Sequence, residues 1–305
     1  MGKELRITKD NEGRRLDRVL RVLWPQVPLG AIMKAIRKGE VRVDAKKAKA
    51  DARLEEGQLV QVPWDDGFTA EVKKPEPERA SKPKKHNPPL QTIYRDNYLW
   101  IVNKPAGLLT QPDTKGGDSL ITRALEELHW ERADFRPSTV QRLDRNTSGI
   151  IIIAMSGAAQ RHLSELIRDR KIKKIYRAVV EGQTDKEGRV DLPLLKDAGS
   201  NTVKPDKHGQ EALSLYRTLS AGQKNSSVEI NLVTGRPHQA RVHMSATGHP
   251  LLGDRKYGDG FGAKRPLLHA YSLTFPEDEK LPRAVSGKTF TAKIPADMEI
   301  FFGKE

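Results

Sequence analysis

The chain has 305 residues, of which 36% are hydrophobic and 31% charged, so it is long enough for more than one domain. The absence of cysteine excludes disulfides, thiolate catalysis and cysteine-ligated zinc. With no membrane-spanning apolar run and no signal-peptide core, the sequence favours a cytoplasmic protein without a membrane partner. The net charge of +14 favours a polyanionic partner, nucleic acid before an anionic membrane, over a basic but inert surface.

Two helices are predicted at the start of the chain. The first carries four apolar residues at helical spacing, namely Leu16, Val19, Leu20 and Leu23. It ends before Pro25. The second helix is predicted over 29–38 and ends at Gly39, which suits a C-terminal cap. Alternating apolar residues then predict strands at 41–43 and 59–62.

Basic residues gather on the second predicted helix and the turn that follows it. The segment 34–49 contains seven cations against two acidic residues: Lys34, Arg37, Lys38, Arg42, Lys46, Lys47 and Lys49 against Glu40 and Asp44. Such a cluster can follow a phosphate backbone, and the alternative is a solvated helix face. We favour RNA, because this surplus exceeds what solubility needs. The predicted RNA contacts of this module are Lys34, Arg37, Lys38 and Arg42.

A proline-rich, charged stretch over 73–90 has almost no apolar residues and cannot bury a core. It is typical of a semi-extended linker. The predicted domains are therefore 13–66, a linker over 67–90, and a larger domain over 91–305.

The larger domain contains many strand patterns and few helical ones. Strands are predicted at 92–94, 99–102, 174–180, 214–218, 228–233 and 270–275. Helices are predicted over 120–130 and from the cap Ser156 to 168, the second with Leu163, Leu166 and Ile167 inward. This succession predicts an α+β fold with a mainly antiparallel sheet. The glycines of 258–262 lack the spacing of a phosphate-binding or dinucleotide-binding loop.

The most informative stretch is 141–149, which places Asp144 between Arg142 and Arg145 just before the apolar run 150–153. Flanking cations lower the pKa of a carboxyl group and burial raises it, so their balance sets its reactivity. Taken alone, the run also fits a solvated ion-pair face.

The strand pattern over 174–180 places Lys174 and Tyr176 on one face. A tyrosine beside a basic residue can stack on a flipped base or move a proton, and the alternative is an ordinary half-buried sheet tyrosine.

The segment 233–244 predicts a strand end followed by a helix with Pro237 in its first turn. His238 and Arg241 then share a face near the helix N-terminus, where anions collect. A metal on His238 and His243 is disfavoured, because their five-residue spacing puts them on different sides of the helix. The stretch 267–270 is interpreted as mainly structural.

Six short motifs occur in the order found in one enzyme family. They are Asn103–Gly107, Arg142–Arg145 with Thr147–Gly149, Lys174-x-Tyr176 with Ala178, Thr234–His243, Gly248–Pro250 with Gly253-Asp254, and Leu268–Ala270. Together they resemble the RluA-type pseudouridine synthases, in layout closest to the RluC branch that modifies ribosomal RNA. Residues 13–66 resemble the alpha-L RNA-binding domain. The chain departs from the family pattern at Gln111 and Gln141, where relatives commonly carry histidine, and at Phe275–Glu277.

The resemblance implies a reaction that needs neither cofactor nor metal. Uridine in RNA loses its N1–C1′ bond, the base turns, and C5 bonds to C1′. Asp144 would be the essential carboxylate, by attack at C1′ or by removal of a ribose proton. Tyr176 would stack on the base and assist loss of the C5 proton, Arg241 would pair with Asp144, and Arg142 would fill the gap left by the flipped nucleotide. The other expected RNA contacts in this domain are Lys174, Arg236, His238 and Gln239.

The expected partner is large-subunit ribosomal RNA or its assembly intermediate, bound by a monomer. Transfer RNA is the alternative substrate. A non-catalytic ribosome-associated RNA-binding factor is disfavoured by the intact Asp144, Tyr176 and Arg241. An N-glycoside hydrolase would commonly use two carboxylates, and the motifs contain one at the expected site.

Overall fold

The structure is a computed structural model that describes residues 3–64, 88–113, 117–132, 135–197, 199–200 and 202–302. The described residues divide into two compact units. One is drawn from Met1–Pro89, Leu125–Ser138 and Ala154–Arg161, and the other from Leu90–Ala124, Thr139–Ile153 and His162–Glu305. Most of the predicted linker, residues 67–87, lies outside the described residues. The predicted domain boundaries stay a prediction.

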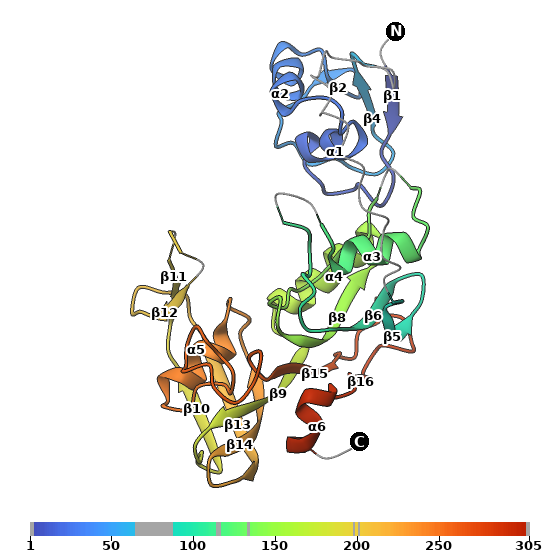
Figure 1. Cartoon of the computed structure of the whole chain (residues 1–305). Helices are drawn as coiled ribbons and strands as arrows, with labels where there is room; N and C mark the ends of the chain where they lie inside the picture. The colour runs from blue at the N-terminus through green and yellow to red at the C-terminus, as the bar shows by residue number, and fades with distance from the viewer. Residues whose placement is uncertain are drawn as a thin grey trace, which may run out of the picture. The chain divides into compact units, whose positions relative to one another are not determined.

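The first unit contains a small α/β module, drawn in blue in Figure 1. Its elements are β1 (Lys3–Arg6), α1 (Leu16–Leu23), α2 (Leu29–Lys38), β2 (Arg42–Val43), β3 (Lys46–Lys47) and β4 (Leu59–Val62). The strands form an antiparallel sheet in the order β1-β4-β2-β3. Both predicted helices are confirmed, and α2 ends at Gly39, whose left-handed φ of 77° lets its N–H bond the carbonyls of Ala35 and Ile36.

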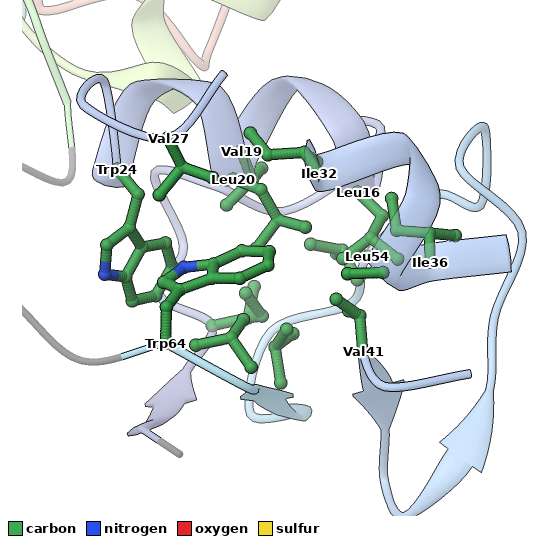
Figure 2. Packing of buried hydrophobic residues seen from close by; sticks show 14 residues of the cluster. Leu16, Val19, Leu20, Trp24, Val27, Ile32, Ile36, Val41, Leu54 and Trp64 are labelled. Carbon is green, nitrogen blue, oxygen red and sulfur yellow. The ribbon is translucent and has the colours of Figure 1, made fainter. Parts of the chain in front are cut away.

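The module has its own apolar core (Figure 2). Both helices turn their periodic apolar residues inward, onto Val41, Leu54 and the strands. Trp24 and Trp64 close one end of the core, with ring centroids 6.1 Å apart in an edge-to-face arrangement. Each such buried side chain contributes about 1.5–3 kcal/mol of transfer free energy. The basic residues of α2 are therefore free to lie on its exposed face.

The second unit is built on a large sheet. Its strands run in the order β10-β13-β14-β9-β15-β8-β6-β5. Their bounds are β5 (Gln91–Arg95), β6 (Leu99–Lys104), β8 (Ser148–Ala154), β9 (Lys173–Glu181), β10 (Glu187–Asp191), β13 (Leu213–Ala221), β14 (Asn225–Leu232) and β15 (Leu268–Thr274). Strand β15 pairs with β8 in parallel. The antiparallel pairs are β10 with β13, β13 with β14, β14 with β9, β9 with β15, and β5 with β6. The α+β fold is confirmed.

Short strands and helices complete the chain (Figure 1). They are β7 (Ser138–Thr139), β11 (Leu194–Lys196), β12 (Val203–Pro205), β16 (Thr289–Thr291), α3 (Leu120–Glu127), α4 (Gly157–Arg168), α5 (Gln239–Ala246) and α6 (Ala296–Phe302). None of the helices in the described residues has the length and the apolar composition needed to cross a membrane.

Two predictions about α3 and α4 need correction, and one is confirmed. Helix α3 ends at Glu127 rather than 130, and the chain turns at His129, whose φ is 47°. Ser156 caps α4 as predicted, since its hydroxyl accepts the N–H of Ala159 at 3.1 Å. Ile167, predicted to face inward, is only half-buried.

Candidate active site

Asp144 lies in the loop that leads into β8, and a buried lysine holds this loop in place. Lys104, at the end of β6, is fully buried, and its Nζ donates to the carbonyls of Leu108 (2.8 Å), Pro105 (2.9 Å) and Arg145 (3.2 Å). Burial lowers the pKa of Lys104 to about 7, against the opposing effect of the Asp144 charge. Lys104 thus ties the Asn103–Gly107 turn to the residue that follows Asp144.

The strand after Asp144 is also fixed closely. Gly149, in β8, has a φ of 118°, and a Cβ there would lie 2.2 Å from the carbonyl oxygen of Ala270. Only glycine allows this approach of β8 to β15. Ser148 and His269 share a buried hydrogen bond of 2.9 Å across the same pair of strands. The stretch 267–270 has the structural role predicted for it.

A chain of three charged groups runs from Asp144 into the interior. Arg241, on α5, places Nη1 3.1 Å from Oδ2 of Asp144. On its other side, Nε and Nη2 bind the two oxygens of Asp254 at 2.7 and 2.8 Å. Asp254 is fully buried and accepts the backbone N–H groups of Lys256 (3.0 Å) and Tyr257 (3.3 Å).

These contacts keep Arg241 and Asp254 charged. Burial opposes the charged guanidinium, but hydrogen bonding and the charges of Asp254 and Asp144 raise the pKa of Arg241. Burial likewise opposes the charged form of Asp254, but Arg241 holds the pKa of this carboxyl below its ordinary value. The Tyr257 ring adds a cation–π contact, 5.0 Å from the guanidinium carbon. These contacts hold the Arg241 guanidinium in a fixed position beside Asp144.

His238 faces the other oxygen of Asp144. It precedes α5 in a left-handed conformation (φ 54°), so Pro237 lies before the helix and the prediction that it occupies the first turn is wrong. The ring Nδ1 shares a hydrogen bond of 2.7 Å with the hydroxyl of Tyr257, and Nε2 lies 3.8 Å from Oδ1 of Asp144. Burial lowers the pKa of His238, which favours a neutral ring. The Asp144 side chain remains 30% exposed.

Tyr176 is half-buried on β9 and packs against the apolar cluster around Ala178 and Ile230. Burial, followed by the charge of Asp144, raises the pKa of Tyr176, so the phenol is neutral. Its hydroxyl has no hydrogen-bond partner among the residues that the structure describes. The neutral Tyr176 hydroxyl, which has no hydrogen-bond partner among the described residues, thus lies close enough to the Asp144 carboxylate for the charge of Asp144 to affect its pKa.

Three other predicted RNA contacts have no carboxylate partner within the described part of the chain. Arg142 is exposed. Lys174 is largely buried on β9, its Nζ lies beside Gly235, and burial followed by Arg170 lowers its pKa. Arg236 also lacks a carboxylate partner among the described residues, but its Nε donates to the backbone carbonyl of Glu211 at 2.9 Å.

The prediction that Gln239 contacts RNA is contradicted by its surroundings. The side chain is buried, and its Oε1 accepts the Thr234 hydroxyl (2.7 Å) and the Arg236 N–H (3.0 Å). Its Nε2 donates to the Leu213 carbonyl and the Ser214 hydroxyl, both at 3.0 Å. All four hydrogen-bonding positions of the amide are occupied. Gln239 fixes the turn before α5 and has no capacity left for a ligand.

The four basic residues predicted to contact RNA in the first unit are exposed: Lys34, Arg37, Lys38 and Arg42. Lys38 lies 3.5 Å from Glu40, and Arg42 donates to the carbonyls of Gly39 and Ala45 at 3.4 and 3.3 Å. Surface contacts of this kind contribute little stability, so these side chains can exchange them for phosphates.

The sequence reasoning missed Lys104, Asp254 and Tyr257 as parts of the site. The first two stood inside the quoted motifs, but their partners come from distant segments. Within the described residues, no group of three histidine or acidic side chains has a geometry suited to a metal ion. Both ring nitrogens of His243 are engaged, with the Ser214 hydroxyl (2.9 Å) and the Leu192 carbonyl (3.0 Å).

Comparison with known proteins gives concordant matches. Residues 98–246 match the family described as RNA pseudouridylate synthase. The chain is 36% identical over 288 residues to ribosomal large subunit pseudouridine synthase C of Vibrio cholerae, a match that covers 90% of this chain and 89% of that protein. It is 34% identical over 292 residues to the protein of that name from Escherichia coli K12, covering 88% and 87%. Among solved structures, human RNA pseudouridylate synthase domain containing 4 has the same fold, with a TM-score of 0.56, 24% identity, and coverage of 70% of this chain and 93% of that one.

Proposed function

As a member of the RNA pseudouridylate synthase family, the chain is an isomerase that converts uridine to pseudouridine in RNA. On this premise we propose that its substrate is large-subunit ribosomal RNA and that Asp144 is its essential carboxylate. The names of its relatives and the basic N-terminal module support this substrate. Transfer RNA is the alternative. A cytoplasmic location and a monomeric state stay predictions.

One observation carries the role of Asp144. Its carboxylate is partly exposed, with one oxygen 3.1 Å from Arg241 and the other 3.8 Å from His238. The Arg241 cation binds the carboxylate and orients it, and a carboxylate is required whether Asp144 attacks C1′ or removes a ribose proton. Because Asp254 already binds two of the guanidinium nitrogens, Arg241 holds its position while Asp144 reacts. This arrangement supports a preorganised site.

Tyr176 would stack on the uracil ring after the N1–C1′ bond breaks. The base turns, C5 bonds to C1′, and the C5 proton must then leave. The Tyr176 hydroxyl, which is neutral and has no partner among the described residues, can assist this transfer. His238 would contact the ribose or base beside Asp144.

The remaining cations would hold the RNA. Arg142 is exposed and can fill the gap left when the uridine leaves its stack, a step that costs a few kcal/mol and less in loops. Arg236, which is partly exposed, would bind a phosphate near the site, whereas the buried Lys174 would line the site beside Gly235. In the N-terminal module, Lys34, Arg37, Lys38 and Arg42 would follow the backbone and make binding depend on salt.

The test is tritium release from RNA labelled at uridine C5, with ribosomal and transfer RNA pools assayed separately. Asp144→Asn keeps the size of the side chain and removes its charge, so release should fall to background while RNA binding persists. Asp191→Asn, an exposed carboxylate paired with Arg189, is the matched control and should keep full release. Unchanged release in Asp144→Asn would refute the assigned role. Release of free uracil would instead indicate a hydrolase.

A further inference from the structure

The glycine-rich loop 258–262 has no role in the site described above, yet it displays an unusual residue. Phe261 is 75% exposed, and it is the one exposed aromatic residue in the part of the chain that the structure describes. Single exposed apolar residues are common and need no explanation by themselves. The backbone around Phe261 carries more information.

Glycines on both sides hold the loop in a defined fold. Gly260 and Gly262 have left-handed φ angles of 72° and 78°. A Cβ on Gly260 would lie 2.4 Å from Cγ of Arg255, and one on Gly262 would lie 2.6 Å from Cδ1 of Leu252. The carbonyl of Phe261 accepts the N–H of Gly253 at 2.9 Å. The loop therefore folds back on 252–255 and leaves the phenyl ring outside.

The same loop is anchored to the elements that carry the site. Gly253, which binds the Phe261 carbonyl, directly precedes Asp254, the buried partner of Arg241. Leu252 donates its N–H to the carbonyl of Val179, on the strand that carries Tyr176, at 2.9 Å. The hydrogen bond between Phe261 and Gly253, together with the peptide bond from Gly253 to Asp254, thus connects the loop to the Asp254–Arg241–Asp144 network.

The charge of the surroundings favours a nucleic acid. Between residues 255 and 264, Arg255, Lys256 and Lys264 are exposed basic residues and Asp259 is the single exposed acidic one. The partly buried Glu181 lies close enough to Asp259 for their charges to interact. Proteins that bind single-stranded RNA combine basic side chains, which follow the phosphates, with aromatic rings, on which bases stack. We propose that Phe261 is an RNA-binding residue that stacks on an unpaired base near the target uridine. The proposal rests on the site proposed above.

The test compares Phe261→Ala, Phe261→Leu and Phe261→Trp on the RNA pool from which the unchanged enzyme releases tritium. Affinity is measured by filter binding, and the single-turnover rate is measured at saturating RNA. Alanine and leucine should weaken binding by about 5- to 140-fold, the range for loss of one base–aromatic stack, and tryptophan should retain it. The rate at saturation should be unchanged. Ile300→Ala, which removes an 87%-exposed apolar side chain from α6, is the matched control and should bind normally.

Leucine separates stacking from simple apolar contact, because it keeps most of the apolar surface without a π-face. Affinity that is unchanged in Phe261→Ala, or fully retained in Phe261→Leu, would overturn the proposal and leave the loop as a surface for another kind of partner. A lowered saturating rate with unchanged affinity would overturn it as well. Failure of the Asp144 assignment is read separately, from tritium release by Asp144→Asn.

Discussion

Removal of the Asp254 carboxylate should destabilise the protein and impair catalysis together. In Asp254→Ala, Arg241 stays largely buried but loses the two bonds of 2.7 and 2.8 Å that hold its Nε and Nη2. Two backbone N–H groups, those of Lys256 and Tyr257, lose their acceptor as well. Arg241 then has Asp144 as its remaining charged partner in the network.

The expected size follows from these losses. A hydrogen bond to a charged group contributes about 1.5–3 kcal/mol, and breaking a buried ion pair by removing one partner costs about 3–5 kcal/mol. Because Asp144 still compensates Arg241 at 3.1 Å, we expect a loss near the lower end, about 3 kcal/mol. For a structural unit of about 200 residues this corresponds to a decrease in Tm of roughly 6–12 °C.

The assay is urea and thermal unfolding followed by tryptophan fluorescence, combined with a double-mutant cycle. Arg241→Ala alone leaves Asp254 buried without its cation, whereas Asp254→Ala with Arg241→Ala removes both charges. The double variant should therefore be less destabilised than the sum of the two single variants, by more than about 2 kcal/mol. A loss below about 1 kcal/mol for Asp254→Ala, or strict additivity, would refute the reasoning. Tritium release by Asp254→Ala should also fall, since the cation beside Asp144 is no longer fixed.

Three further predictions concern other parts of the site and the basic surface. The pKa of Lys104 is about 7 in the folded protein against an ordinary value of 10.5, so between these values the unfolded chain holds a proton that the folded chain has released. The free energy of unfolding should therefore rise with pH from 7 to 9, and Lys104→Met should remove this rise. Urea unfolding across that pH range measures both proteins, and an equal dependence of the unfolding free energy on pH in the two would contradict the prediction. Tyr176→Phe keeps the ring and removes a hydroxyl without a partner among the described residues, so stability should change by less than about 0.5 kcal/mol and RNA affinity should persist while tritium release falls. Full release in this variant would exclude the hydroxyl from loss of the C5 proton. Lys34→Gln with Arg37→Gln should lower the slope of log affinity against log salt by about 1.4–1.8, measured by filter binding. The same exchange at the exposed Lys186 and Lys224 is the charge-matched control, and an equal decrease there would argue against a specific role for α2.

Local features of this protein follow from the sequence because they depend on neighbouring residues. The apolar spacing of 16–23 and 29–38 produced α1 and α2, and Gly39 ended α2 as its lack of a Cβ allows. Asp144 was predicted to be the essential carboxylate from its flanking arginines and from the order of motifs, which is a property of the chain itself. The family followed from the same order.

The hydrogen-bond and ion-pair partners of these side chains, in contrast, depend on contacts between segments that are separated in the sequence. Arg241 binds Asp254, thirteen residues along the chain, and Lys104 binds the carbonyl of Arg145, forty-one residues away. Gln239, which follows His238, was predicted to contact RNA. In the structure its side-chain amide is buried and forms four hydrogen bonds to groups of residues 213–236. The sequence determined the family and predicted which side chains carry the chemistry. Only the tertiary structure decided which of them are free to act, because burial and the supply of hydrogen-bond partners are set by packing between segments that no local pattern relates.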